Sequence, residues 1–292
     1  MTRRIYIIMC SLMLCITAAA QRYTPFDVVD TTADKILVER LLKESGNLAE
    51  GENFALFFAR KFIGRPYAAN TLEVADPECL VVDTRRFDCT TLVEVVTALT
   101  ICAQNNDSRY EGFLDVLMSL RYGGFLYDYT SRIHYFSAWI VENDIRGWVK
   151  DIQSPNPPFK AVQTLDLWYM SRNADKYVML RRHPEFVSEI RSQEEGYKGR
   201  KFRYIPKASV VDSPLMRKTV LDGDIIAITT SKPGLDIAHV GFAVWKKDGL
   251  HLLNASLTHK KVVEEQLTLG EYLKRHKSFT GIRVVRIRNV EK

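Results

Sequence analysis

The sequence predicts an α+β fold, because helical patterns fill roughly the first 200 residues and strand patterns follow them. Before that point apolar residues recur at three-and-four spacing, and after it come short segments rich in Val and Ile. Helices first and antiparallel strands later are typical of an α+β domain. With 292 residues, 46% of them hydrophobic, the chain has enough apolar material for a large core, which excludes an intrinsically disordered chain.

The helical part begins with an amphipathic segment over 31–45, which Gly46 ends, and a second over 52–62, which Gly64 ends. Further helices are expected over 89–104, 109–121, 135–148, 165–181 and 184–195. Strands are expected over 201–205, 223–230, 239–246, 250–257, 260–263 and 280–288, with one helix over 268–276 among them. No repeat or linker interrupts this order, so we expect a single domain over 21–292 with a helical elaboration over about 105–200.

The first twenty residues have the pattern of a secretory signal peptide. Arg3 and Arg4 precede an uncharged run whose apolar core, Ile5 to Ile16, is too short to span a bilayer. The run ends in three alanines, a small-residue cleavage pattern, so we predict a signal peptide over 1–20 that is cleaved after Ala20. An uncleaved membrane anchor is the alternative. Cleavage implies an exported protein with no stable membrane insertion.

Export leaves Cys79, Cys89 and Cys102 in the mature chain. An odd number of cysteines in an oxidising compartment predicts at least one free thiol, and whether Cys79 pairs with Cys102 stays open. Loss of Arg3 and Arg4 lowers the net charge from +6 to +4. This near balance, without a block of Lys or Arg, argues against a nucleic-acid partner.

Cys89 has the position of a nucleophile. Asp88 is a good N-cap for the helix over 89–104, which places Cys89 in its first turn. The positive end of the helix dipole there favours the thiolate, and the free N–H groups can stabilise an oxyanion. The alternative is that Cys89 is only a small buried residue. Cys102 falls on the apolar stripe of the same helix and is interpreted as core.

A thiol nucleophile needs a base and a group that orients the base. His239 shares a strand face with the small Ala243, which leaves room over it, and Asn254 lies on the returning strand. A plain two-residue turn at Asp248-Gly249 would leave Asn254 roughly 13 Å from the position opposite His239, at about 3.3 Å per residue. We therefore predict a longer loop or a bulge that shifts the pairing by two residues. An undistorted two-residue turn would count against the Cys–His–Asn set.

Short segments in a fixed order resemble motifs of the NlpC-like cell-wall cysteine hydrolases. They are Gly64-Arg65-Pro66-Tyr67, Asp88-Cys89-Thr90-Thr91-Leu92-Val93, Gly223-Asp224-Ile225-Ile226, His239-Val240-Gly241-Phe242-Ala243-Val244 and Leu252-Leu253-Asn254-Ala255. A closer resemblance, to the N-acetylmuramoyl-L-alanine amidase-like branch, adds Ser131-Arg132-Ile133-His134-Tyr135, Tyr204-Ile205-Pro206 and Gly234-Leu235-Asp236-Ile237-Ala238-His239. Together these segments cover most of the chain, from about residue 55 to 288.

The resemblance implies a papain-like fold, in which the nucleophile's helix packs against an antiparallel sheet. It also implies that Cys89 attacks an amide carbonyl, that His239 moves the proton and that Asn254 orients the imidazole. The backbone N–H of Cys89, with Tyr67 nearby, would hold the oxyanion. Asn254 departs from the wider superfamily, which often has His at that position; an amide can orient an imidazole equally well.

The implied substrate is a muropeptide, including anhydro-muropeptides, cleaved between the lactyl group of muramic acid and L-alanine. The residues assigned to substrate binding are Tyr67, Asp88, Arg132, His134, Tyr135, Tyr204 and Asp236. The sequence has neither His-Glu-x-x-His nor Cys-x-x-Cys, so no metal or other cofactor is expected. The resemblance further implies a periplasmic location, and we expect a monomer. The alternatives are a γ-D-glutamyl-diamino-acid endopeptidase and a non-catalytic cell-wall binding protein on the same fold.

Overall fold

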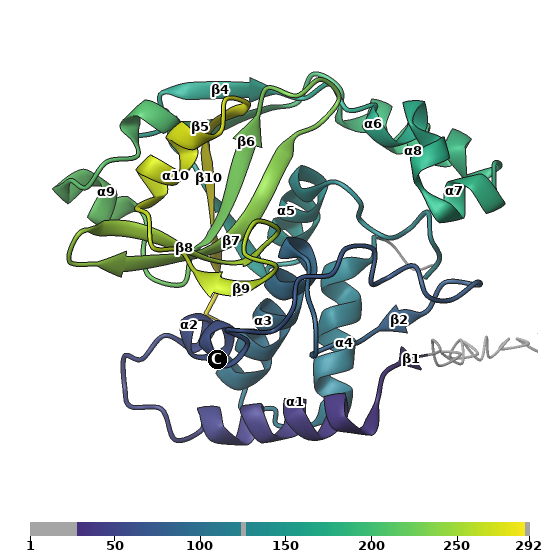
Figure 1. Cartoon of the computed structure of the whole chain (residues 1–292), viewed down its shortest axis with the longest axis horizontal. Coiled ribbons are helices and arrows are strands. Elements are labelled where there is room, and N and C mark those ends of the chain that lie inside the picture. The colour runs from purple at the N-terminus through teal and green to yellow at the C-terminus, as the bar shows by residue number, and fades with distance from the viewer. Residues whose placement is uncertain (1–27, 124–126, 290–292) are drawn as a thin grey trace, which may run out of the picture.

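The computed structural model describes residues 28–123 and 127–289. The predicted signal peptide lies outside these residues. Helices and one large sheet form a mixed α/β arrangement, with the sheet on one side of the helices α1 to α5 (Figure 1). Within the described part of the chain, no helix is long and apolar enough to cross a membrane.

The helical side is organised around α3 (Cys89–Gln104), whose residues from Thr91 to Cys102 are all buried. Its apolar side chains pack with those of the neighbouring helices and of one face of the sheet in a single core. The helices around it are α1 (Thr32–Ser45), α2 (Phe54–Lys61), α4 (Tyr110–Arg121) and α5 (Phe136–Ile145). These five helices confirm the ones predicted over 31–45, 52–62, 89–104, 109–121 and 135–148. Cys102 lies in the core, as its place on the apolar stripe predicted.

The sheet is antiparallel and its strands follow the order β4-β5-β10-β6-β7-β8-β9, with β3 also paired to β10. The predicted strands are confirmed as β5 (Lys201–Pro206), β6 (Ile225–Thr230), β7 (Ile237–Lys246), β8 (Gly249–Ser256), β9 (Lys261–Glu264) and β10 (Phe279–Ile287). The helix predicted over 268–276 is α10 (Leu269–Arg275), which covers the second face of the sheet together with α9 (Pro214–Thr219). The sheet therefore has a packed core on each face.

The region from 105 to 200 is less helical than expected. It contributes β3 (Val149–Ile152) and β4 (Ala161–Thr164) to the sheet, and neither was predicted. The helix expected over 165–181 is wrong: the structure has α6 (Tyr169–Arg172), a 3₁₀ turn over Ala174–Lys176 and α7 (Val178–Arg182). Asn173 breaks the helix because its backbone leaves the helical region, at φ −126° and ψ 37°, while its side chain donates to the carbonyl of Tyr169.

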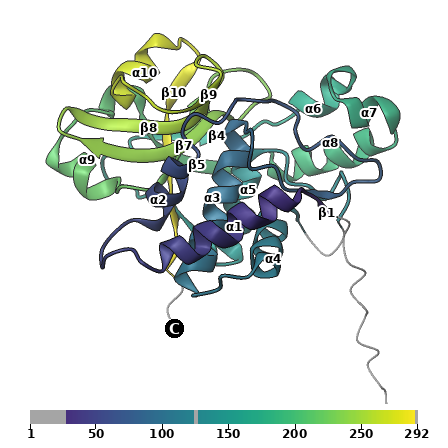
Figure 2. The same cartoon turned by 60° about the horizontal axis from the view of Figure 1, so that its bottom comes forward.

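The helix predicted over 184–195 is α8 (Phe186–Tyr197). It packs with α6 and α7 around a separate small core. The three helices lie together at one end of the molecule in both Figure 1 and Figure 2. A 3₁₀ turn over Lys207–Ser209 follows β5. Two short strands, β1 (Val28–Val29) and β2 (Leu80–Val81), pair in parallel with each other.

The hairpin between β7 and β8 has the register that the Cys–His–Asn set requires. The position of the turn, and not a longer loop or a bulge, produces this register. The turn is a two-residue turn at Lys247-Asp248, so the prediction of a longer loop or bulge there was wrong. Because the turn begins one residue earlier than assumed, Leu252 rather than Asn254 pairs with Ala243, which is the shift of two residues. Asn254 therefore lies beside Gly241, close to the start of β7.

Candidate active site

Cys89 begins α3, and Asp88 is its N-cap as predicted. The Asp88 carboxylate accepts from the backbone N–H of Thr91 at 2.8 Å, and the Thr91 hydroxyl oxygen accepts from the backbone N–H of Asp88 at 3.0 Å. This reciprocal capping box fixes the first turn of the helix. Its backbone N–H groups, including that of Cys89, have no partner in the helix ladder and face outward from its positive end.

Tyr67 is held close to Cys89 by main-chain pairing. The Pro66 carbonyl accepts from the N–H of Phe87 at 3.0 Å, and the Phe87 carbonyl accepts from the N–H of Ala68 at 2.9 Å. This short parallel pairing places Tyr67 next to the residues that precede α3. Burial, with the nearby Cys89 and Asp88, raises the pKa of Tyr67 to about 12. Its hydroxyl therefore keeps its proton and can act as a hydrogen-bond donor at neutral pH.

The surroundings of Cys89 favour its neutral thiol. Desolvation, and then the negative charge of Asp88, raise the pKa of Cys89 to about 12, although hydrogen bonds from the Val240 backbone and the Thr90 side chain lower it. The helix dipole favours the thiolate, but burial opposes the charge of the thiolate more strongly in this arrangement. Desolvation also lowers the pKa of His239. Both shifts favour the neutral forms of the two groups.

His239 lies near the start of β7, where the strand changes register. Ile228 of β6 pairs with His239, and the next residue, Thr229, pairs with Ile237, so Ala238 is the extra residue of a β-bulge. Bulges re-aim the side chains beside them, and here the bulge directly precedes the imidazole. Nε2 of His239 lies 2.9 Å from Oδ1 of the fully buried Asn254.

The chain of polar contacts continues beyond Asn254 to residues that the sequence did not indicate. Nδ2 of Asn254 donates to Oε1 of Glu265 at 3.1 Å, and Oε2 of Glu265 lies 3.2 Å from Nε2 of His259. Glu265 is buried, whereas half of the His259 side chain is exposed. Glu265 follows β9 in a loop, where neither spacing nor periodicity gives a signal for it.

Cys89 and His239 line the same cavity, of about 200 Å³. Of the residues predicted to bind substrate, His134, Tyr135 and Asp236 line it too. The others on its wall are Glu73, Thr90, Ile133, Phe136, Met170, Tyr177, Leu235, Ile237, Ala238 and Val240. The wall thus joins the start of α3, the segment before α5, the start of β7 and the module of α6 and α7. Glu73 and Tyr177 are polar wall residues that the sequence did not indicate.

Each of the three predicted wall residues has a polar atom that contacts another part of the protein. Nε2 of His134 lies 2.8 Å from the Tyr129 carbonyl, and burial, reinforced by Arg132, lowers the pKa of His134 to about 3. The Tyr135 hydroxyl donates to Glu194 at 2.7 Å.

Asp236 has a similar structural contact. Oδ2 of Asp236 accepts from the backbone N–H of Ser137 at 2.6 Å. Asp236 thereby caps α5, although it lies outside that helix in the sequence. Through this contact, Asp236 connects the cavity wall before β7 to the first turn of α5.

Arg132 and Tyr204 lie apart from the cavity wall. Arg132 is buried between Glu73 and Glu78, at 3.6 and 3.4 Å, and its guanidinium lies 4.9 Å from the centre of the Tyr129 ring. Tyr204, on β5, packs against Gly281 of β10, where a Cβ would lie 2.7 Å from the Tyr204 ring. Substrate binding by either residue stays a prediction.

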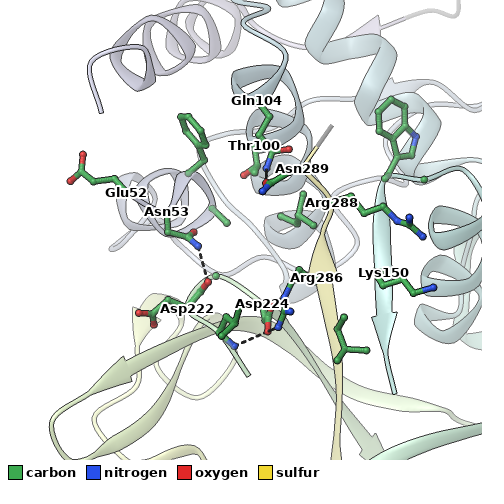
Figure 3. A pocket seen from close by; sticks show the side chains of 18 of the residues that line it. Glu52, Asn53, Thr100, Gln104, Lys150, Asp222, Asp224, Arg286, Arg288 and Asn289 are labelled. Atoms are coloured by element: carbon green, nitrogen blue, oxygen red, sulfur yellow. Dashed lines mark hydrogen bonds and ion pairs between the residues drawn. The ribbon is translucent and has the colours of Figure 1, made fainter. Parts of the chain in front are cut away.

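A larger cavity, of about 1120 Å³, lies elsewhere, between α2 and the ends of β6 and β10 (Figure 3). Its polar groups pair with one another: Asn53 donates to the Asp222 carbonyl at 2.7 Å, and Arg286 donates to Asp224 at 2.7 Å. Neither Cys nor His is found among the described residues that line it. It therefore has no Cys–His pair like that of the smaller cavity. Among residues 28–123 and 127–289, no cluster of His, Cys, Asp and Glu is arranged to hold a metal ion.

Comparison with known proteins places this chain in a family. A profile of the N-acetylmuramoyl-L-alanine amidase-like family matches residues 57–282. A crystal structure named as an N-acetylmuramoyl-L-alanine amidase, from Bacteroides uniformis, is 38% identical and has a TM-score of 0.75; the match covers 80% of this chain and 98% of that one. A putative xylanase from Bacteroides fragilis is 39% identical with a TM-score of 0.72, covering 79% and 99% of the two chains.

A protein from Legionella pneumophila, at 20% identity and a TM-score of 0.67, shares the fold, with 87% of this chain and 94% of that one covered. No curated protein sequence matches the chain. The family profile spans more than half of the sequence and includes Cys89, His239 and Asn254. The chain belongs to the N-acetylmuramoyl-L-alanine amidase-like family.

Proposed function

We propose that this protein is a cysteine amidase that hydrolyses the bond between N-acetylmuramic acid and L-alanine in muropeptides, anhydro-muropeptides included. One observation carries the proposal: Cys89 at the start of α3 shares a cavity with His239, whose imidazole is hydrogen-bonded to Asn254. A nucleophile, a base and a group that orients the base are the requirements for nucleophilic acyl transfer. The name of the Bacteroides uniformis structures supports the choice of bond.

In the first step His239 takes the proton of the Cys89 thiol as sulfur attacks the lactyl carbonyl carbon. Starting from a neutral pair, the proton moves with the attack, so His239 acts as a general base. The carbonyl oxygen gains negative charge, which the backbone N–H of Cys89 and the Tyr67 hydroxyl are suited to stabilise. Donors held by the helix start and by the main-chain pairing of Tyr67 would limit reorganisation during the reaction.

Collapse of the tetrahedral intermediate breaks the C–N bond, and the imidazolium of His239 gives its proton to the leaving amine of L-alanine. The lactyl group remains on Cys89 as a thioester. His239 then takes a proton from water, the resulting hydroxide displaces the thiolate, and the thiolate recovers its proton from the imidazolium. The products are the sugar acid and an intact stem peptide.

The name of the Bacteroides fragilis neighbour suggests a different reaction, glycoside hydrolysis, which needs two carboxylates flanking the bond. The wall of this cavity has two acidic residues, Glu73 and Asp236. Asp236 is engaged with the N–H of Ser137, and Glu73 pairs with the buried Arg132. Neither is arranged as a general acid opposite a second free carboxylate, so we favour the amidase.

The test is incubation with a purified disaccharide–tetrapeptide, in its reducing and anhydro forms, followed by mass spectrometry. Free disaccharide together with intact tetrapeptide is the expected result. Cleavage after the D-glutamyl residue would support the endopeptidase instead, and release of sugar from xylan would support the glycosidase. The variant Cys89→Ala should be inactive, while Cys102→Ala, which removes the other buried thiol, serves as the matched control. Equal turnover by Cys89→Ala would overturn the cysteine mechanism.

We also propose that the enzyme works outside the cytoplasm, as its family's cell-wall substrates require. The signal peptide predicted over 1–20 supports this location. Expression of the full chain in a bacterium with an outer membrane, followed by fractionation and N-terminal sequencing, tests it. A periplasmic protein that starts at Gln21 is expected, and a cytoplasmic protein that keeps its first residues would contradict the proposal.

A further inference from the structure

Glu265 lies behind the His239–Asn254 pair, and no part of the proposed reaction uses it. We propose that Glu265 is a positioning residue, which fixes the orientation of the Asn254 amide and thereby selects the tautomer of His239 that can accept the proton of Cys89. This inference rests on the proposed function, because it assigns the base of that reaction. It concerns the state of His239 itself, however, which is measurable without any substrate.

The donors and acceptors of Glu265, Asn254 and His239 fix the direction of the two hydrogen bonds between them. An ionised carboxylate only accepts hydrogen bonds, so the Asn254 group that faces Oε1 of Glu265 at 3.1 Å must be the NH₂. The amide oxygen of Asn254 then faces Nε2 of His239 at 2.9 Å. An amide oxygen only accepts, so Nε2 must bear the proton. The lone pair of a neutral imidazole is consequently on Nδ1, which is left as the base.

Burial prevents water from taking the place of Glu265. The Asn254 side chain is fully buried and Glu265 is only 5% exposed. If Glu265 were apolar, the amide of Asn254 would be free to turn by 180° and present its NH₂ to Nε2 of His239. That contact stabilises the other tautomer, in which Nδ1 carries the proton and has no lone pair to offer.

Glu265 itself is held from several sides. Its backbone N–H donates to the Leu252 carbonyl at 2.8 Å, and its carbonyl accepts from Nδ1 of the buried His251 at 3.0 Å. Its second carboxylate oxygen lies 3.2 Å from Nε2 of His259. The acceptor for Asn254 is therefore fixed in place by β8 on one side and by His259 on the other.

The charge of Glu265 has a second effect, on the imidazolium that forms during the reaction. Glu265 and Asp88 both favour protonated His239, whereas desolvation disfavours it, and His276 lies close enough to interact with it. Asn254 and the Cys89 thiol, also close to the imidazole, carry no charge in the resting site. Replacing Glu265 by Gln removes one negative charge from this set and keeps an acceptor for Asn254. The pKa of His239 should then fall.

The experiment compares Glu265→Leu and Glu265→Gln with Glu264→Gln as the matched control. Glu264 precedes Glu265 directly but pairs with Lys246 and Arg60, away from the Asn254 contact. The first readout is ¹⁵N NMR of imidazole-labelled protein at a pH where His239 is neutral, combined with thermal unfolding to identify any variant that does not fold. The native chain, Glu264→Gln and Glu265→Gln should all show His239 protonated at Nε2, and folded Glu265→Leu should show a substantial Nδ1-protonated fraction.

The second readout is the pH dependence of kcat/KM on the muropeptide. We expect kcat to fall about 100-fold in Glu265→Leu with little change in KM, because a wrong tautomer removes the base and leaves binding intact. Glu265→Gln should recover most of that loss, and its acidic limb should move to lower pH. The proposal is overturned if folded Glu265→Leu keeps the Nε2 tautomer, or if Glu265→Gln fails to recover what Glu265→Leu loses. If the native chain and all the variants fail to cleave the muropeptide, the proposed function is wrong. The NMR measurement still tests the role of Glu265 in that case, because it needs no substrate.

Discussion

Oδ1 of Asn254 lies 2.9 Å from Nε2 of His239 across a diagonal of the β7–β8 pair, because Asn254 stands beside Gly241 and not opposite the histidine itself. The contact depends on the hairpin register, which the two-residue turn at Lys247-Asp248 sets. A slip of the strand by one residue would turn Asn254 to the other face of the sheet. The contact between His239 and Asn254 is therefore specified by a turn at the far end of the hairpin.

The first prediction concerns the amide of Asn254. Asn254→Ala removes the acceptor for Nε2 of His239 and leaves the imidazole free to rotate, so kcat should fall by about 10² while KM changes little. Steady-state kinetics on the disaccharide–tetrapeptide measures both constants. Asn156→Ala, at an exposed loop position, is the control. Unchanged kcat in folded Asn254→Ala would rule out an orienting role.

Gly241 gives a second prediction, about the space that this contact needs. A Cβ at position 241 would lie 2.6 Å from the Leu253 carbonyl oxygen and 2.9 Å from Cβ of Asn254, both on the neighbouring strand. Gly241→Ala should push β8 away from β7 and lower the free energy of unfolding by about 1–3 kcal/mol, with loss of activity. Urea unfolding and muropeptide turnover measure these effects.

The matched control is Gly196→Ala on α8, where a Cβ would meet nothing within 4 Å. Alanine is the better helix former, so this change should raise the free energy of unfolding by about 0.5–1 kcal/mol. Equal stability of the two variants would show that the close approach at Gly241 is not limiting.

The sequence predicts the members of this site better than it predicts their surroundings. Asp88 as N-cap and Cys89 in the first turn follow from local capping rules, and strand parity puts His239 and Asn254 on one face. The register of the hairpin did not follow, because a Lys247-Asp248 turn and an Asp248-Gly249 turn overlap at Asp248 and only the folded sheet distinguishes them. Glu265 could not be found, since its loop brings it to Asn254 through tertiary contacts alone.

Tertiary contacts also limit what the sequence can predict about the region before residue 200. The apolar pattern over 165–181 is real, but Asn173 and the packing against α8 divide it into short turns. Arg132 is among the residues predicted to bind substrate, yet Glu73 and Glu78 lie on either side of it. A positive side chain in a sequence gives no sign of whether its partner is a ligand or a distant residue of its own chain.

A third prediction tests the buried ion pair beneath the start of α3. Nε of Arg121 donates to Glu94 at 2.8 Å, and both side chains are 2% exposed. Glu94→Leu leaves the guanidinium buried without its counter-charge and should cost about 3–5 kcal/mol in the free energy of unfolding. The double variant Glu94→Leu with Arg121→Leu should recover much of that loss. Chemical denaturation decides, and a double variant less stable than Glu94→Leu alone would contradict this account.

Asp236 provides a fourth prediction, about how the cavity wall is held. Its carboxylate accepts from the N–H of Ser137 and so joins the segment before β7 to the start of α5. Asp236→Ala should lower stability by about 1 kcal/mol, the usual cost of losing a cap, and reduce kcat/KM. Asp236→Asn keeps an acceptor and should be close to the native chain in both. If Asp236→Asn were as impaired as Asp236→Ala, the carboxylate charge rather than the cap would be the important property.

The protonation state of the resting site gives the last prediction. Desolvation and Asp88 raise the pKa of Cys89 to about 12, and desolvation lowers that of His239, so the free enzyme should hold a neutral thiol beside a neutral imidazole. Alkylation of Cys89 by iodoacetamide should then keep accelerating as pH rises from 6 towards 10, because the thiolate fraction grows throughout that range. Peptide mapping separates this reaction from alkylation of the other cysteines, and Cys89→Ser provides the blank. A thiolate–imidazolium pair would instead react at a constant rate across neutral pH. A plateau between about pH 5 and 8 would therefore contradict the neutral pair and show that Cys89 is better solvated than its burial in the structure indicates.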